Sequence, residues 1–219
     1  MRLVIAVFFL GFCAGAGCAS ATPAVSCTGS CDCTSGTCTC AAGSTCSLGA
    51  ATDGGAGADA GLPSDITFDC QKNNTCVVSC GSNCTSHCAN NTTCSGTCGS
   101  GCESTCTAMS VCNQTLGTGS TGTCAGTSTC TLAAGADSGV SCEGGSVCNL
   151  TLAPGSSAKC LGTSTCAVNC PDGGCTLECA SGDATCSCSG GCTLTCGAGL
   201  TLKSCPNGDQ CVRGNAACR

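Results

Sequence analysis

Apolar and polar residues alternate with a period of two in short segments that recur through most of the chain. Two clear examples are STCTLAA (residues 128–134) and SVCNLTL (residues 146–152), in which cysteine, leucine and alanine fall on one face. A shorter segment ending in cysteine accompanies each of them, as in SGVSC (138–142) and SSAKC (156–160). Strict alternation over a few residues is typical of half-buried β-strands. The pattern therefore predicts two short strands in every repeating unit.

The cysteines mark a repeat of 18 residues. Two cysteine tracks keep this spacing without a break: Cys70, Cys88, Cys106, Cys124, Cys142 and Cys160 form the first, and Cys76, Cys94, Cys112, Cys130, Cys148 and Cys166 form the second. Two partial tracks follow the same period: Cys80, Cys98 and Cys170, and then Cys84 and Cys102. Self-similarity at a fixed period indicates a repeat architecture in which each unit stacks on its neighbours.

Small residues recur at two fixed places in the repeat and predict two bends. Glycine follows the first cysteine track by two residues in the later repeats, at Gly126, Gly144 and Gly162. A second glycine position lies between the two partial cysteine tracks, at Gly81 and Gly99, and continues at Gly117 and Gly135. Each repeat is thus expected to be one flattened coil with two short strands and two tight bends.

Stacked coils of this kind form an all-β fold, a parallel β-solenoid that rises about 4.8 Å per coil. We expect sulfur and a few aliphatic side chains to fill its narrow interior. The coil is similar in length to those of left-handed β-helices, but the aliphatic residue that this family places at every sixth position is not kept. The handedness therefore stays open.

The cysteine spacing also predicts which sulfurs are bonded. Cysteines six residues apart can close a C-x5-C loop across one bend, and those of the C-x3-C type can close a loop across the other. Middle repeats lose both C-x3-C cysteines together, as a bonded pair should. The expected disulfides are Cys70–Cys76, Cys80–Cys84, Cys88–Cys94, Cys98–Cys102, Cys106–Cys112, Cys124–Cys130, Cys142–Cys148, Cys160–Cys166 and Cys170–Cys175.

The composition explains why such a chain needs disulfide cross-links within each coil, which we call staples. The 219 residues include 34 cysteines and 34 glycines, with no Trp or Tyr and only four Phe, so a large apolar core is not expected. Glycine-rich chains lose much backbone entropy on folding, and covalent links offset that loss. The formal charge of −6 and the six scattered basic residues argue against binding nucleic acid or an anionic membrane surface.

The first residues, MRLVIAVFFLGFCAGAGCAS, combine one arginine, an apolar run and small residues. This is the pattern of a secretory signal, which is too short for a stable membrane span. Gly15-Ala16-Gly17-Cys18 resembles a bacterial lipobox, although Gly15 stands where that motif usually has leucine; Ala19-Ser20-Ala21 offers an alternative cleavage site. Both cleavages leave 32 cysteines for pairing, an even number.

The lipobox and a linker rich in Gly, Ala and Asp resemble the N-termini of bacterial cysteine-rich secreted lipoproteins. That resemblance implies lipidation at Cys18 and an extracytoplasmic location, at the outer membrane or cell surface if the protein is lipidated and otherwise secreted. Within residues 18–46, the segment CAAGSTC (40–46) matches CAGTSTC (124–130), which indicates either a degenerate first coil or a small knot. We expect a signal peptide over 1–17 (alternatively 1–21), a cysteine-rich segment over 18–46, a linker over 47–69, solenoid repeats over 70–195 and a cap over 196–219.

Candidate chemistry is sparse. His87 is the only histidine, so a Ser/His/Asp triad that does not use His87 cannot be built. The carboxylates are spread along the repeats, at Asp137, Glu143, Asp172, Glu178 and Asp183. We therefore expect no enzyme and no cofactor. Three C-x-C pairs, Cys31/Cys33, Cys38/Cys40 and Cys186/Cys188, keep a metal-sequestering protein as one alternative.

The strands themselves resemble the Thr/Cys-rich solenoids of insect antifreeze proteins, whose repeats carry T-C-T. One outward rank reads Thr75, Thr93, Val111, Thr129, Val147 and Thr165, but the next rank is mixed and the coil is longer than in that family. The resemblance implies ice binding as a second alternative. The reading we favour is a lipid-anchored structural or surface-interaction protein, whose partner is an unidentified surface component or a carbohydrate.

Overall fold

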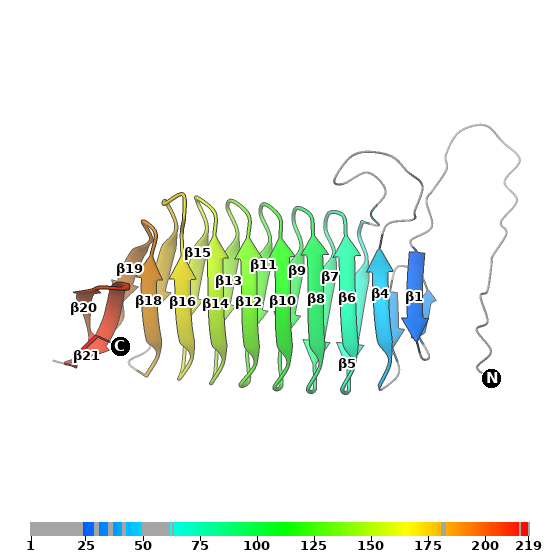
Figure 1. The fold of residues 1–219 in the computed structure, drawn as a ribbon, viewed down its shortest axis with the longest axis horizontal. Coiled ribbons are helices and arrows are strands. Elements are labelled where there is room, and N and C mark those ends of the chain that lie inside the picture. Colours follow the sequence, from blue (N-terminus) through cyan, green and yellow to red (C-terminus); the bar gives the residue numbers. More distant parts are fainter. Residues whose placement is uncertain are drawn as a thin grey trace, which may run out of the picture.

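The computed structural model describes residues 24–28, 31–34, 37–40, 43–49, 62, 64–180, 183–214 and 216–218. The predicted signal peptide, the predicted lipidation site Cys18 and most of the predicted linker lie outside the described residues. All secondary structure in the described part of the chain is β-strand, and the strands form two sheets. The predicted all-β parallel solenoid of stacked coils is confirmed, with the coils lying side by side along one axis (Figure 1).

The two sheets, which we call sheet A and sheet B, take alternate strands of the chain. Sheet A has 11 strands, in the spatial order β1 (Ala24–Thr28), β4 (Thr45–Gly49), β6 (Thr75–Cys80), β8 (Thr93–Cys98), β10 (Val111–Leu116), β12 (Thr129–Ala134), β14 (Val147–Leu152), β16 (Thr165–Asn169), β18 (Thr185–Ser189), β21 (Gly208–Arg213) and β20 (Leu200–Cys205). Sheet B has 10 strands, in the order β2 (Cys31–Thr34), β3 (Thr37–Cys40), β5 (Thr67–Gln71), β7 (Thr85–Ala89), β9 (Glu103–Cys106), β11 (Thr121–Cys124), β13 (Gly139–Cys142), β15 (Ser157–Cys160), β17 (Thr176–Cys179) and β19 (Thr193–Cys196).

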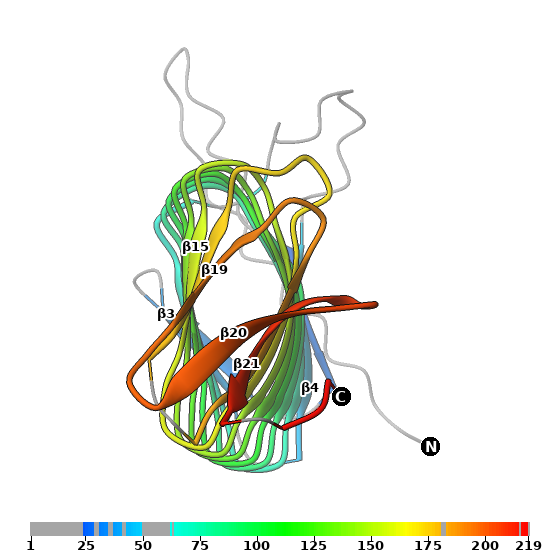
Figure 2. The same ribbon diagram turned by 90° about the vertical axis from the view of Figure 1, so that its left-hand side faces the viewer.

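The register of both sheets follows the sequence period. Cys112 pairs with Cys130 between β10 and β12, and Cys124 pairs with Cys142 between β11 and β13, so identical columns of the repeat lie over one another. Seen along the solenoid axis, the two sheets face each other across a narrow interior (Figure 2). We call the turn from a sheet B strand to the next sheet A strand the first bend, and the return turn the second bend.

The glycines at the two bends act in different ways. Gly126, Gly144 and Gly162 at the first bend have φ angles of +61°, +67° and +66°, a conformation that side chains with a Cβ disfavour. At the second bend, a Cβ on Gly117 would lie 2.5 Å from the carbonyl carbon and oxygen of Gly99 in the neighbouring coil. The second glycine ladder therefore permits close stacking of coils.

Sulfur and aliphatic side chains fill most of the interior, as the alternation predicts, but one aromatic residue joins them. Phe68 is 1% exposed and lines the same interior space as Gly96 and Gln114. The amide of Gln114 is also buried here, where its Nε2 donates to the Ser86 hydroxyl at 3.3 Å and its Oε1 accepts from Ser104. The expectation of an interior without aromatics is therefore wrong in this coil.

Buried hydroxyl ladders satisfy backbone groups at both bends. At the second bend, the amide of Ser120 donates to the Ser138 hydroxyl at 3.2 Å, and the amide of Ser138 donates to the Ser156 hydroxyl at 3.1 Å. The Ser138 hydroxyl also donates to the Gly117 carbonyl at 3.2 Å. A matching ladder at the first bend includes Ser110 and Ser128. These serines replace ladder hydrogen bonds where the backbone turns away from regular pairing.

Replacing Ser138 with alanine is expected to destabilise the protein by about 1–3 kcal/mol, because the buried amide of Ser120 loses its acceptor. Ser157→Ala is the matched control, since Ser157 is exposed on β15, and should change stability by less than about 0.5 kcal/mol. Guanidinium unfolding of the disulfide-intact proteins measures both values. Equal stabilities for the two variants would show that the ladder contributes nothing.

The solenoid begins earlier in the chain than the predicted boundary at residue 70. β3 pairs in parallel with β5 and β4 pairs in parallel with β6, so residues 37–49 form a further coil, the degenerate first coil rather than a separate knot. β4 and β5 also occupy both ends of the predicted linker over 47–69. Parallel pairing continues through β19, which ends at Cys196, close to the predicted start of the cap.

Antiparallel strands close both ends of the stack. β1 pairs with β4 and β2 pairs with β3 at the N-terminal end. At the C-terminal end β21 pairs with β18, and the hairpin that β21 forms with β20 lies across the end of the coils (Figure 2). Terminal units of this kind cover the sheet edges that would otherwise be open to another chain.

Candidate functional site

The disulfides link the two sheets at the bends. The structure forms a bond at each spacing that the sequence singles out: Cys70–Cys76, Cys80–Cys84, Cys88–Cys94, Cys98–Cys102, Cys106–Cys112, Cys124–Cys130, Cys142–Cys148, Cys160–Cys166 and Cys170–Cys175. The C-x5-C pairs span the first bend, and the C-x3-C pairs, together with the C-x4-C pair Cys170–Cys175, span the second. Their Cα atoms lie 6.2–6.6 Å apart, and most of the sulfurs are fully buried.

Among the described residues from 176 to 218, four further disulfides were not predicted from the sequence. They are Cys179–Cys186, Cys188–Cys192, Cys196–Cys211 and Cys205–Cys218. The first two are further staples across the bends. Cys179–Cys186 spans one residue more than the C-x5-C pairs, whereas Cys188–Cys192 keeps the C-x3-C spacing and could have been predicted from it. The last two tie the C-terminal hairpin to β19 and to the chain end, and no periodicity relates those cysteines.

The residues considered for catalysis lie in separate local environments. His87 is on the outer face of β7, in register with Asp69 and Thr105. Glu143 accepts a hydrogen bond from Ser141 at 2.8 Å, and Glu178 forms an ion pair with Lys159 at 3.2 Å. At the C-terminal end Asp183 pairs with Arg213, while Asp137 has a φ of +56° at a second bend and Asp172 is exposed in another.

Two of the three C-x-C pairs lie together on the paired strands β2 and β3, and the third lies in β18. Cys186 and Cys188 are neighbours in β18, and each is bonded to a different partner across a different bend. Cys31 and Cys33 lie in β2, and Cys38 and Cys40 lie in β3, where Cys38 is buried and disulfide-bonded. Cys31 pairs with Cys40 and Cys33 with Cys38 in the backbone register.

The outer face of sheet A carries no charged side chain from β6 to β18, and its charged residues, such as Lys203 and Arg213, lie in the C-terminal hairpin. We call the outward side chains of β6, β8, β10, β12, β14, β16 and β18 the polar face. Three ranks run along it: Thr75, Thr93, Val111, Thr129, Val147, Thr165 and Thr185; then Val77, Ser95, Asn113, Thr131, Asn149, Ala167 and Ser187; then Ser79, Thr97, Thr115, Ala133, Thr151, Asn169 and Ser189. None of these side chains is charged or aromatic. The face is therefore a lattice of small hydroxyl, amide and methyl groups.

Sheet B has the opposite character. Its outward positions include Asp69, His87, Glu103, Lys159 and Glu178, one titratable residue in each of five strands. A strand placed in either sheet buries its alternate residues in the same way, so folding alone does not require this division. Among the strands of the stacked coils, the charged side chains lie in sheet B, and this segregation of charge marks the polar face as the candidate interaction surface.

No protein-family model, curated protein or solved structure matches this chain. In the part of the chain that the structure describes, no helix has the length and apolar character needed to cross a membrane. The fold and its bonded sulfurs define the class directly: this is a disulfide-stapled parallel β-solenoid. Extensive disulfide bonding is consistent with an extracellular structural protein, because such bonds persist in oxidising compartments.

Proposed function

We propose that this protein is a non-enzymatic structural component of the extracytoplasmic space that lays its polar face against a neutral polysaccharide. The single observation that carries the proposal is the segregation of charge described above. A neutral polymer offers no counter-charge, so every ionised group placed against it would lose hydration without a partner. The polar face holds no such group, whereas sheet B presents five titratable residues to solvent.

The contact would cover a broad area, and each hydrogen bond within it would be weak. The polar face lacks aromatic side chains that could stack on sugar rings, so hydroxyl and amide groups would supply the hydrogen bonds. Neighbouring coils repeat these groups about every 4.8 Å, and outward residues along a strand repeat about every 6.6 Å. Many equivalent contacts on one rigid body add up to useful avidity when the ligand is itself a repeating polymer. Lipidation at Cys18 would hold the N-terminal part of the protein at the membrane.

The test places two positive charges on either sheet. Thr131→Lys with Thr151→Lys charges the polar face, and Thr121→Lys with Thr193→Lys charges sheet B at exposed positions. Both variants have the same composition and net charge. We expect wild type and the sheet B variant to be retained by cellulose or chitin in a pull-down, and the polar-face variant to lose retention by about ten-fold or more. Equal retention of the two variants, or no retention of wild type, would refute the proposal.

Ice binding is the second candidate, and the register of the polar face favours it. The rank that begins at Thr75 places threonine or valine over one another in successive paired strands. Side chains that combine a methyl group with a hydroxyl can order water at regular spacing on a flat surface. Thermal hysteresis of the same three proteins separates the candidates: freezing-point depression that the polar-face charges abolish supports ice, and its absence in wild type excludes ice.

A further inference from the structure

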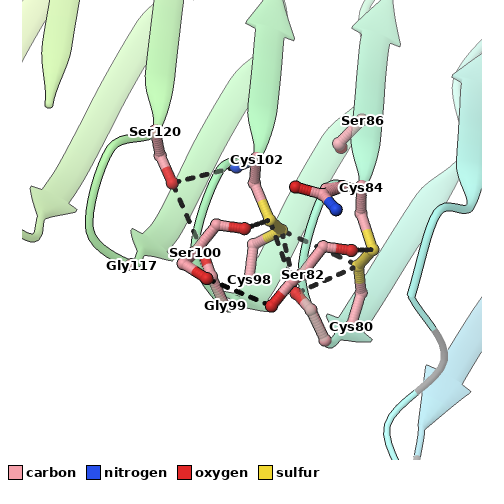
Figure 3. The surroundings of a disulfide bond; sticks show 12 residues. Cys80, Ser82, Cys84, Ser86, Cys98, Gly99, Ser100, Cys102, Gly117 and Ser120 are labelled. Carbon is pink, nitrogen blue, oxygen red and sulfur yellow. Dashed lines mark hydrogen bonds between the residues drawn. A yellow bond between two sulfur atoms is a disulfide. The ribbon is translucent and has the colours of Figure 1, made fainter.

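Two disulfides stack on each other at the second bends of neighbouring coils. Cys80–Cys84 closes the bend between β6 and β7, and Cys98–Cys102 closes the bend between β8 and β9 (Figure 3). Parallel pairing aligns Cys80 with Cys98, and their Sγ atoms are 3.7 Å apart. All four sulfurs lie within 4.8 Å of one another. We call these four residues the tetracysteine cluster.

The cluster differs from the other sulfur groups of the described chain. At the first bends, neighbouring coils bring three sulfurs within the same distance, as with Cys70, Cys76 and Cys94. Towards the C-terminal end another set of three comprises Cys170, Cys175 and Cys192. Only the tetracysteine cluster, among the described residues, offers four sulfur ligands in one place.

Four sulfurs at this spacing match the requirement of a tetrahedral zinc site. A Zn–S bond of about 2.3 Å in tetrahedral geometry separates the ligand sulfurs by about 3.8 Å. The Cys80–Cys98 separation already has this value, and the bonded partners have Cα atoms 6.6 Å and 6.2 Å apart. Thiolate sulfur is a soft ligand that selects zinc over hard cations such as Mg²⁺ or Ca²⁺.

The surrounding backbone keeps the four positions together when the disulfides are open. Neighbouring strands hold Cys80 and Cys98 in one ladder, and the amide of Gly99 donates to the carbonyls of Cys80 and Gly81 at 3.1 and 2.8 Å. The amide of Glu103 donates to the Cys84 carbonyl at 2.8 Å on the other side of the bend. Cys98 is only partly buried, so small reagents and ions can reach the cluster from the bend.

We propose that the reduced tetracysteine cluster is a Zn²⁺ site, and that a thiol reductant therefore converts two staples into one metal-bridged staple between two coils. Each disulfide takes two electrons and two protons from a dithiol, which itself becomes a disulfide, and this leaves four cysteine thiols. Zinc then binds the four sulfurs as thiolates and releases four protons. The metal joins neighbouring coils, which the original disulfides do not.

The experiment titrates the full-length protein with a water-soluble phosphine, with and without one equivalent of Zn²⁺. The phosphine takes the oxygen of one water per disulfide, and the two hydrogens of that water pass to the sulfurs. Iodoacetamide then labels free thiols, and mass spectrometry maps them. We expect zinc to protect Cys80, Cys84, Cys98 and Cys102 together, with one metal per chain in the native mass spectrum. Protection at other cysteines, or labelling of these four at the same rate with and without zinc, would overturn the proposal.

A second measurement uses Co²⁺ as a spectroscopic probe on paired variants. Cys98→Ser with Cys102→Ser removes two ligands of the cluster, and Cys142→Ser with Cys148→Ser removes one staple elsewhere. We expect the tetrahedral thiolate spectrum of Co²⁺ in partially reduced wild type and in the second variant, and its loss in the first. Retention of that spectrum in the first variant would overturn the proposal. Because protection mapping uses wild type, a variant that fails to fold does not remove the test.

Discussion

We expect full reduction to unfold the solenoid at room temperature: with excess phosphine and a zinc chelator present, the far-ultraviolet β-sheet signal should be lost and the chain should become sensitive to proteases. Each C-x5-C staple stabilises the folded state by about 2 kcal/mol through loop closure. Domains of this size are stable by only about 5–15 kcal/mol in total. The described chain contains more than ten disulfides, six of them of the C-x5-C type, and few large apolar side chains, so their loss removes more stability than the fold has available.

The control for this experiment is the same protein in the same buffer without reductant, which should resist guanidinium unfolding. Stepwise alkylation during the titration shows how many disulfides must open before the sheet signal falls. If the fully reduced and alkylated chain keeps its sheet signal, the buried sulfurs act only as apolar filling and the covalent bonds are dispensable.

The second large effect is expected from a single methyl group at the second bend. In Gly117→Ala, the added Cβ would lie 2.5 Å from the carbonyl of Gly99, a backbone group that cannot rotate away. The two coils must separate locally, which disturbs the glycine ladder and the serine ladder beside it. We expect a destabilisation of about 3 kcal/mol, equivalent to a melting temperature about 6–12 °C lower.

Gly139→Ala is the matched control, because a Cβ on Gly139 meets nothing within 4 Å. It should change stability by less than about 0.5 kcal/mol. Calorimetry of the disulfide-intact proteins measures both shifts. A melting temperature for Gly117→Ala within 2 °C of the control would mean that the coils absorb the methyl group and that close stacking is not required (about 2–4 °C corresponds to 1 kcal/mol here).

The sequence predicts the stacked coils well because their length is constant. When every coil has 18 residues, parallel pairing places each column over itself, so Cys112 lies over Cys94 and under Cys130. Inward and outward positions then follow from alternation alone. Prediction weakens after Cys170, where an additional bend residue lengthens the loop to Cys175 and displaces the tracks.

Features that depend on one coil, or on the ends, were not predictable in this way. Phe68 is in register with Ser86, and Gln114 is in register with Gly96 and Leu132, so the repeat does not determine either residue. Cys196–Cys211 depends on an antiparallel hairpin whose register no repeat encodes. The buried serine ladders were missed because serine at a bend is usually a solvated turn residue.

The sequence predicted the outward residues of the candidate surface but not its contrast in charge with sheet B. The ranks beginning at Thr75 and Val77 were recognised as outward, but their uncharged character gains meaning only beside sheet B. The assignment of Asp69, His87 and Lys159 to the opposite sheet requires the folded arrangement of strands. The tetracysteine cluster likewise needs the stacking of coils, since its two C-x3-C motifs are 18 residues apart in the chain.

Antiparallel strands close the solenoid at both ends, so the number of coils between them sets its length. Between the ends, the coils from β9 to β16 share one length and one strand register, so each presents similar interfaces to its neighbours. Duplicating or deleting one unit, such as residues 124–141, would therefore lengthen or shorten the body by about 4.8 Å without disturbing either terminus. Unequal recombination within the gene would thus change the length of the solenoid in uniform steps.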